Sequence, residues 1–192
     1  MGQLVKDPFF FGYGSLVNRQ THSYDYALRA RVRGWRRAWR HTQGREVPFL
    51  TGVPCEATEI DGLVARVPNA DWVALDQRED GYLRHAVGDR LQVDAEHSIK
   101  AQIYAVPEHS VVYPEVLAPI LLSYLDVVVQ GYLHEFGEQG AQDFFDTTDG
   151  WNVPVRDDRA APVYPRHTVL SAPERRFVDT RLDDLGVHIV RG

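Results

Sequence analysis

The pattern of apolar and polar residues changes near residue 110. Before this point, apolar residues occur in short runs or alternate with polar ones, which predicts β-strands at residues 27–41, 62–68, 82–91 and 100–106. Beyond it, apolar residues recur three or four positions apart from Val116 to Phe136. This spacing predicts an amphipathic helix of about six turns, broken near Gly131 and followed by further helix at residues 142–145.

Glycine and proline residues interrupt the predicted strands. Gly34 lies inside the alternating segment 27–41 and predicts a bulge or bend there. Pro48 and Pro54 predict that residues 46–58 form a loop with at most an edge strand, because proline cannot donate the backbone hydrogen bond that a central strand needs. The arginines between residues 29 and 40 alternate with other residues, which is typical of a solvated sheet face.

A short helix is predicted at residues 70–79, after the strand that ends at Pro68. Asn69 is a suitable capping residue, and Gly81 ends the helix. Trp72, Leu75 and Glu79 are spaced so that they share one face. We therefore expect the Glu79 carboxylate to point into the protein rather than into water.

The order of these elements is typical of a small α+β fold. We expect a mixed β-barrel with flanking helices over residues 1–110, followed by a helical and irregular C-terminal extension over residues 111–192 that packs on it. Residues 187–190 are apolar enough to form a last strand. Residues 149–166 are rich in aromatic and charged residues, and the sequence leaves open whether they form a lid or a packing strap.

Charge and cysteine content exclude several classes of function. The chain carries 21 Lys and Arg against 27 Asp and Glu, a net charge of −6, which argues against nucleic-acid binding as the main role. The single cysteine, Cys55, permits no internal disulfide and no thiolate metal site. No apolar run approaches the length of a membrane span and no leader pattern is recognisable, so we expect a cytoplasmic protein without membrane contact, cofactor or bound metal.

One stretch near the start combines buried strand and tight turn. Residues 9–17 read Phe-Phe-Phe-Gly-Tyr-Gly-Ser-Leu-Val. The two glycines allow a sharp turn that directs several main-chain N–H groups toward one point, where they would bind an anion. No third glycine or Gly-Lys-Ser/Thr follows, so neither a Rossmann nor a P-loop nucleotide site is indicated. Ser15 lacks the flanking residues of a nucleophile elbow.

Two motifs together resemble a known family. Residues 11–16, Phe-Gly-Tyr-Gly-Ser-Leu, precede residues 75–84, Leu-Asp-Gln-Arg-Glu-Asp-Gly-Tyr-Leu-Arg, with the apolar strand 62–68 between them. This arrangement resembles the γ-glutamylcyclotransferase-like superfamily, including its ChaC-type members that degrade glutathione. The resemblance covers residues 9–106. It implies a compact mixed barrel and an enzyme that releases 5-oxoproline without a cofactor.

The resemblance also implies roles for individual residues. The loop residues Gly12, Tyr13, Gly14, Ser15, Leu16 and Val17 would hold a γ-glutamyl group, and Glu79 would be the general acid and base. The loop N–H groups would bind the substrate's α-carboxylate without a nearby arginine. Tyr82 and Arg84 are candidates to position Glu79, and a surface ion pair of Glu79 with Arg78 or Arg84 is the structural alternative.

A non-catalytic module that keeps the fold and binds a ligand or partner is the alternative function. An exposed Glu79 far from the loop would favour this alternative. The sequence leaves open the leaving group, the pathway and the oligomeric state.

Overall fold

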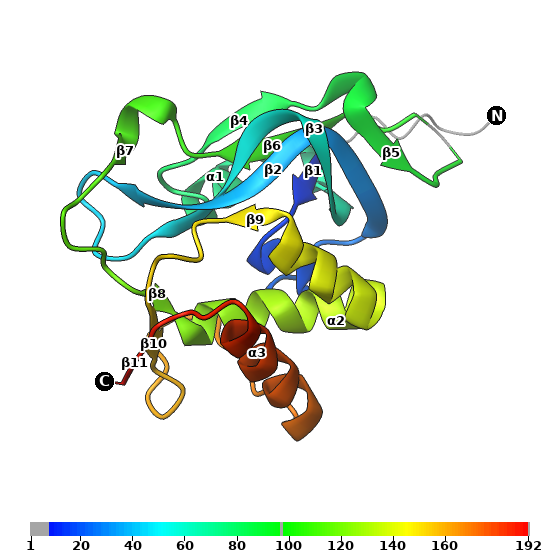
Figure 1. Cartoon of the computed structure of the whole chain (residues 1–192). Helices are drawn as coiled ribbons and strands as arrows, with labels where there is room; N and C mark the ends of the chain where they lie inside the picture. Colours follow the sequence, from blue (N-terminus) through cyan, green and yellow to red (C-terminus); the bar gives the residue numbers. More distant parts are fainter. Residues whose placement is uncertain (1–7, 97, 192) are drawn as a thin grey trace.

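A curled, mixed β-sheet with flanking helices forms the molecule (Figure 1). The computed structural model describes residues 8–96 and 98–191. Six strands follow one another in the order β4-β6-β1-β3-β2-β5, and β7 and β9 also pair with β2. The strand bounds are β1 Phe9–Gly12, β2 Leu28–Thr42, β3 Phe49–Arg66, β4 Leu83–Ala86, β5 Leu91–Val93, β6 Ala101–Ala105, β7 Val111–Val112 and β9 Thr148–Asp149. The predicted α+β fold class is confirmed.

Within the described residues, the large sheet is accompanied by three α-helices and a small second sheet. The helices are α1 Val73–Arg78, α2 Leu122–Asp146 and α3 Ala172–Asp184. The second sheet has the order β11-β10-β8, with bounds β8 Ile120–Leu121, β10 Val155–Asp157 and β11 Ile189–Arg191. Helix α2 runs beneath the large sheet in Figure 1, and α3 lies below α2. Among the described residues, no helix has both the length and the apolar character needed to cross a membrane.

The predicted bulge at Gly34 is confirmed, and it changes which face of β2 is buried. Gly34 has a φ of +79°, and the pairing with β3 shifts between Arg33 and Trp35. A one-residue shift in a strand exchanges the two faces. Odd-numbered positions are therefore exposed before the bulge, as at Arg31, but face the interior after it, as at Trp35 and Arg37.

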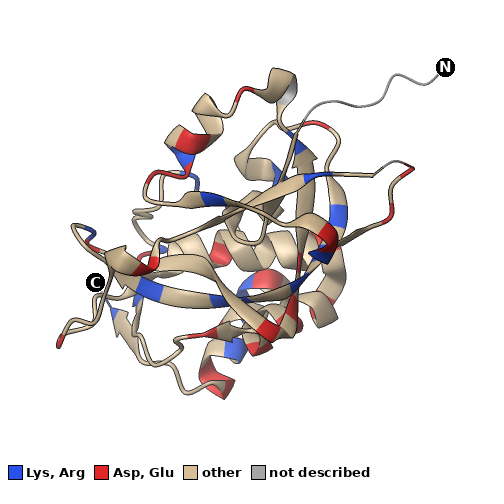
Figure 2. Ribbon diagram, turned by 90° about the horizontal axis from the view of Figure 1, so that it is seen from above, with Lys and Arg blue, Asp and Glu red and all other residues tan. Residues whose placement is uncertain are grey.

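Arg37 therefore departs from the predicted solvated face. Its side chain is fully buried, and its guanidinium donates hydrogen bonds to Tyr132 Oη at 2.9 Å, Thr148 Oγ1 at 3.1 Å and Thr147 Oγ1 at 2.5 Å. Burial lowers the pKa of Arg37 from its usual value. The other charges are interspersed along the chain, as Figure 2 shows; Arg31, for example, pairs with Asp61 at 2.6 Å.

Residues 46–58 were predicted to be a loop with at most an edge strand, but residues 49–58 belong to the long strand β3. β3 runs without interruption from Phe49 to Arg66 and pairs with β2 on both sides of the bulge. β1 pairs only with residues 63–66 of β3, so β1 needs no backbone hydrogen bond from Pro54. Proline is therefore tolerated at this position of the strand. Residues 55–58 of β3 have no paired residue in β2, because the register between the two strands shifts there.

The helix predicted at residues 70–79 is shorter, and its cap differs. It begins at Val73, whose N–H is bonded by the Asp71 carboxylate at 3.1 Å. Asn69 does not cap it, because its φ of +53° belongs to a separate turn. The helix ends at Arg78, and Glu79 is its C-terminal cap residue.

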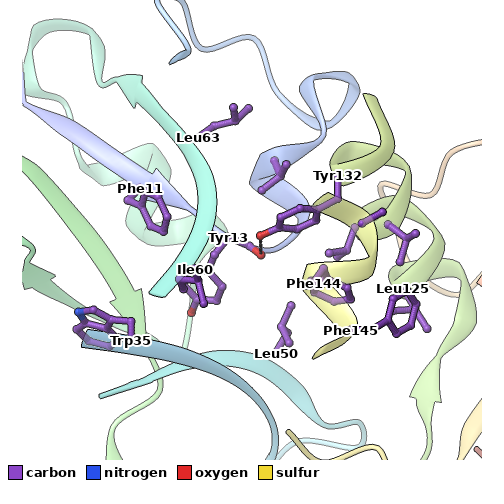
Figure 3. Close-up of a cluster of buried hydrophobic side chains, with 14 of the residues drawn as sticks. Phe11, Tyr13, Trp35, Leu50, Ile60, Leu63, Leu125, Tyr132, Phe144 and Phe145 are labelled. Atoms are coloured by element: carbon purple, nitrogen blue, oxygen red, sulfur yellow. Dashed lines mark hydrogen bonds between the residues drawn. The ribbon is translucent and has the colours of Figure 1, made fainter. Parts of the chain in front are cut away.

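One hydrophobic core extends across residue 110, where the sequence pattern changes. Tyr13 and Leu63 from the first part share a cluster with Leu125, Tyr132 and Phe144 from α2 (Figure 3). Helix α2 is the predicted amphipathic helix, but its break lies at Gly137, with φ +70°, rather than at Gly131.

Gly131 instead permits a close approach between α2 and the loop after β1. A Cβ atom at Gly131 would lie 2.7 Å from the Asn18 main-chain nitrogen. The buried Asn18 amide also donates to the Val127 carbonyl at 2.9 Å. The sequence did not indicate this contact, which fixes the loop against α2.

The C-terminal region contains a helix that the sequence analysis missed. α3 begins with a capping box in which Ser171 and Glu174 bond each other's backbone, and it buries Val178 and Leu182. Most residues of α3 are charged or polar, so these two apolar positions did not produce a recognisable helical pattern. The strand predicted at residues 187–190 is confirmed as β11, one or two residues later.

Candidate active site

The glycine-containing loop after β1 is shaped by close contacts. A Cβ atom at Gly12 would lie 2.5 Å from Leu16 Cβ, and one at Gly14 would lie 3.0 Å from the Tyr124 hydroxyl. Neither glycine has a positive φ, so limited space rather than a left-handed backbone requires them. The turn is closed by hydrogen bonds from Val17 N–H to the Gly14 carbonyl at 3.0 Å and from Asn18 N–H to the Ser15 carbonyl at 3.1 Å.

Main-chain donors remain available inside this loop. The N–H groups of Gly14 and Leu16 have no hydrogen-bond partner within the part of the chain that the structure describes. The Ser15 N–H interacts with the hydroxyl of Tyr124. Buried N–H groups are rarely left unsatisfied, so free donors at a cavity wall indicate a place for a polar ligand or water.

A small apolar cluster brings α1 next to this loop. Leu75 is fully buried and packs with Phe10 of β1, with Leu16 of the loop and with Tyr104 of β6. Glu79 follows Leu75 by one helical turn, and its N–H bonds the Leu75 carbonyl at 2.9 Å. The prediction that apolar neighbours direct Glu79 inward agrees with its side-chain exposure of 17%.

The loop and Glu79 line one connected cavity. Its main chamber has a volume of about 230 Å³, and an inner recess of about 30 Å³ lies against residues 11–16. Five residues line both parts, Ser15, Leu50, Glu79, Tyr82 and Tyr124. The recess has room for about two water molecules, which is the scale of a carboxylate group.

The Glu79 carboxyl group is shielded from solvent and lies next to an arginine. Burial raises its pKa above the usual value, and the positive charges of Arg78 and Arg166 oppose part of this rise. Glu79 Oε1 lies 3.3 Å from Arg78 Nε. The resulting carboxyl group is easier to protonate near neutral pH than an exposed glutamate.

Arg78 joins the two motifs. Its Nη1 donates to the Thr21 carbonyl at 2.8 Å, and its Nη2 contacts Thr21 Oγ1 at 2.9 Å and Ser15 Oγ at 3.4 Å. The expectation that no arginine lies near the loop is therefore wrong. Of the two arginines predicted as possible partners of Glu79, Arg78 and Arg84, it is Arg78 that forms the ion pair. This pair is shielded from solvent and does not lie on the surface.

The other residues named from the sequence occupy different places. Tyr82 lines the cavity and donates its hydroxyl to the Leu50 carbonyl at 2.8 Å. Arg84 pairs with Asp76 at 3.0 Å and does not line the cavity. Val17 has no exposed surface and supports the loop from the core.

Tyr13 borders the recess, but its hydroxyl is engaged. It donates to the Tyr104 carbonyl at 2.5 Å and accepts from the Gly52 N–H at 2.7 Å. Burial raises the Tyr13 pKa above its usual range, so the hydroxyl stays protonated. Tyr13 therefore shapes the recess wall and has no free proton to offer a ligand.

Several cavity residues come from elements that the sequence did not connect to the site. Tyr124 lies in the first turn of α2, and its hydroxyl has no acceptor within the described residues. Burial raises its pKa well above the usual value, so it remains a donor at neutral pH. Tyr164 and Arg166 come from the C-terminal region, where Tyr164 packs edge-on against Tyr124 at 4.9 Å. Only the last two lay in a segment, 149–166, that the sequence singled out.

Within residues 8–96 and 98–191, no cluster of three or more His, Cys, Asp or Glu side chains is arranged to hold a metal ion. The cavity thus offers main-chain donors, a tyrosine hydroxyl, a shielded carboxyl group and arginines. These groups suit proton transfer on a small polar molecule that carries a carboxylate.

The curled mixed sheet thus carries the glycine loop and the shielded glutamate at one cavity. The sequence model of the family described as "Gamma-glutamyl cyclotransferase, AIG2-like" matches residues 10–124, and the chain belongs to this family. The match includes both the loop and Glu79.

Solved structures share the fold at low sequence identity. One described as "Gamma-glutamyl cyclotransferase" is 14% identical, with a TM-score of 0.58, over 91% of this chain and 99% of its own. An uncharacterized protein from Homo sapiens is 15% identical, with the same TM-score and the same coverage. YkqA from Bacillus subtilis is 17% identical, with a TM-score of 0.55, over 76% of this chain and 56% of its own. No curated protein sequence matches the chain.

Proposed function

We propose that the protein is a cofactor-independent γ-glutamylcyclotransferase that converts a γ-glutamyl amine, amino acid or peptide into 5-oxoproline and the free amine. The observation that carries this proposal is that Glu79 and the loop 12–16 line the same cavity. Family membership supports the reaction class. The substrate is a small γ-glutamyl compound.

The reaction needs no nucleophile from the protein. The substrate's α-amine, once deprotonated, attacks its own γ-carbonyl carbon, and a five-membered lactam forms as the bond to the leaving nitrogen breaks. Glu79 accepts the proton that the attacking nitrogen loses and gives it to the leaving nitrogen. Such proton transfer contributes about 10²–10⁴-fold in rate, and holding amine and carbonyl in contact supplies much of the rest.

The loop would hold the substrate's charged groups. In this proposal the Gly14 and Leu16 N–H groups, which are free of other partners, bind the α-carboxylate in the inner recess. The Tyr124 hydroxyl faces the same recess and is a candidate donor to the carbonyl oxygen as it gains negative charge. Loss of one donor to such an oxyanion typically costs about 10²–10³-fold in rate.

The alternative of a non-catalytic binding module has less support. It would predict an exposed glutamate remote from the loop, whereas the Glu79 side chain is 17% exposed and borders the loop's own recess. A module that only binds a ligand also has no need for a shielded carboxyl group with a raised pKa.

Release of 5-oxoproline by the purified protein tests the proposal. The panel contains glutathione, several γ-glutamyl amino acids and γ-glutamyl-ε-lysine. We expect at least one to be converted, and Glu79→Gln to lower the rate at least 10²-fold with an unchanged circular dichroism spectrum. The matched control is Glu46→Gln, an exposed glutamate that does not line the cavity. No product from any compound, or equal rates for Glu79→Gln and the parent, would contradict the proposal.

A further inference from the structure

Among the described residues that line the main chamber, one arginine has no ion-pair partner. Four of the five charged residues that line the chamber form two ion pairs, Arg78 with Glu79 and Arg45 with Asp80. The fifth, Arg166, makes no hydrogen bond and no ion pair within the described residues. The chamber therefore has an excess positive charge that a bound anion would neutralise.

The segment that carries Arg166 is held in place. Asp158 accepts hydrogen bonds from the Ser123 N–H at 2.8 Å, the Ser123 hydroxyl at 2.6 Å and the Val163 N–H at 2.9 Å. The Tyr164 N–H donates to the same Ser123 hydroxyl at 3.2 Å. These bonds fix the segment to the start of α2, so Arg166 projects from an ordered part of the cavity wall.

Arg166 lies at the end of the cavity where the leaving group would sit. It lines the main chamber, whereas the inner recess is lined by the loop and does not include it. With the glutamyl carboxylate in the recess, the group attached to the γ-carbonyl extends into the main chamber. Glu79 lines this same chamber.

We propose that Arg166 binds a carboxylate on the leaving group, so that the preferred substrates are γ-glutamyl amino acids or peptides rather than γ-glutamyl amines. This inference rests on the proposed function. A guanidinium matches a carboxylate in charge and in the spacing of its donors. A neutral amine leaves Arg166 without a partner, and an amine that carries a second ammonium group is repelled by it.

The test compares two compounds that differ by one carboxylate, γ-glutamylalanine and γ-glutamylethylamine. For the parent protein we expect kcat/KM to be about 10–100-fold higher for γ-glutamylalanine, the effect typical of one charged hydrogen-bonded pair. Arg166→Gln should lower kcat/KM for γ-glutamylalanine by this factor and change the value for γ-glutamylethylamine less than threefold. Arg166→Lys should lower kcat/KM for γ-glutamylalanine less than Arg166→Gln does, because lysine keeps the positive charge but lacks the paired N–H donors of the guanidinium.

Arg156→Gln is the matched control. Arg156 is an exposed arginine of the same C-terminal region that does not line the cavity, and we expect no change with either compound. Point variants are preferred to truncation because residues beyond 147 supply buried side chains such as Val155 and Val178.

The possible failures are distinguishable. The inference is contradicted, and the proposed function is left intact, if Arg166→Gln lowers kcat/KM equally for both compounds. The same holds if the parent protein prefers γ-glutamylethylamine. No 5-oxoproline from either compound or from the wider panel contradicts both.

Discussion

Arg78 Nη1 donates a 2.8 Å hydrogen bond to the carbonyl oxygen of Thr21, across 57 positions of sequence. This bond ties the end of α1 to the 3₁₀ turn Arg19–Thr21, just after the glycine loop. The same guanidinium reaches Ser15 Oγ at 3.4 Å and lies beside Glu79. Arg78 is therefore a positioning residue for the two parts of the candidate site.

Replacement of Arg78 by Lys should loosen this connection. One ammonium group cannot reproduce the contacts of the guanidinium with both oxygen atoms of Thr21 and with Ser15. Loss of one hydrogen bond from a charged donor costs about 1.5–3 kcal/mol, so the free energy of unfolding in urea should fall by about this amount. Arg84→Lys, at an exposed pair with Asp76, should change it by less than about 1 kcal/mol. Equal stability of Arg78→Lys and the parent would show that the hydrogen bonds of Arg78 to Thr21 and Ser15 do not stabilise the fold.

The pH dependence of the reaction should reveal Glu79. Because burial raises its pKa, the carboxylate that accepts the proton is lost at a higher pH than for an exposed glutamate. We expect kcat/KM to fall on the acid side with a midpoint above 4.5 and a slope of one proton. Glu46→Gln should show the same fall of kcat/KM at acid pH. An acid limb at the ordinary glutamate value would argue that Glu79 is solvated.

The stability of Glu79→Gln should exceed that of the parent at neutral pH. A carboxyl group with a raised pKa in the folded state binds a proton more tightly there than in the unfolded chain, so its contribution is most favourable at low pH. That contribution is lost as the pH rises through the folded-state pKa. Glutamine carries no such charge, so the difference in unfolding free energy should be small at pH 4 and should grow toward pH 7. A difference that shrinks with rising pH would contradict the assigned direction.

Gly131→Ala should destabilise the fold through a clash. The added methyl group would lie 2.7 Å from the Asn18 nitrogen, and overpacking of this kind costs about 1–3 kcal/mol. The better helix propensity of alanine returns about 1 kcal/mol at most. Thermal unfolding should show a lower Tm for Gly131→Ala, whereas Glu138→Ala, at an exposed position of α2, should change it little. An unchanged Tm would mean that α2 and the loop after β1 can move apart at Gly131 and Asn18 without loss of stability.

Parts of the fold were predictable because they depend on local pattern. The apolar run 62–68, the bulge at Gly34 and the periodic helix α2 follow from spacing and from glycine, and all three are present. Residues 46–58 and α3 were not predictable in this way. Pro54 is accepted in β3 only because one edge is unpaired with β1 there, and α3 has only two fully buried residues to mark it.

The sequence by itself determined the identity of the chemical groups: a glycine loop after a buried strand, and a glutamate one helical turn beyond a buried leucine. Local spacing is enough for this, because it sets which side chains share a face. Only the tertiary structure decided that Arg78, Tyr124 and Arg166 join them at one cavity, because these residues come from α1, α2 and the C-terminal region. Their meeting depends on long-range packing, through Leu75 against β1 and Asn18 against α2, which has no periodicity along the chain.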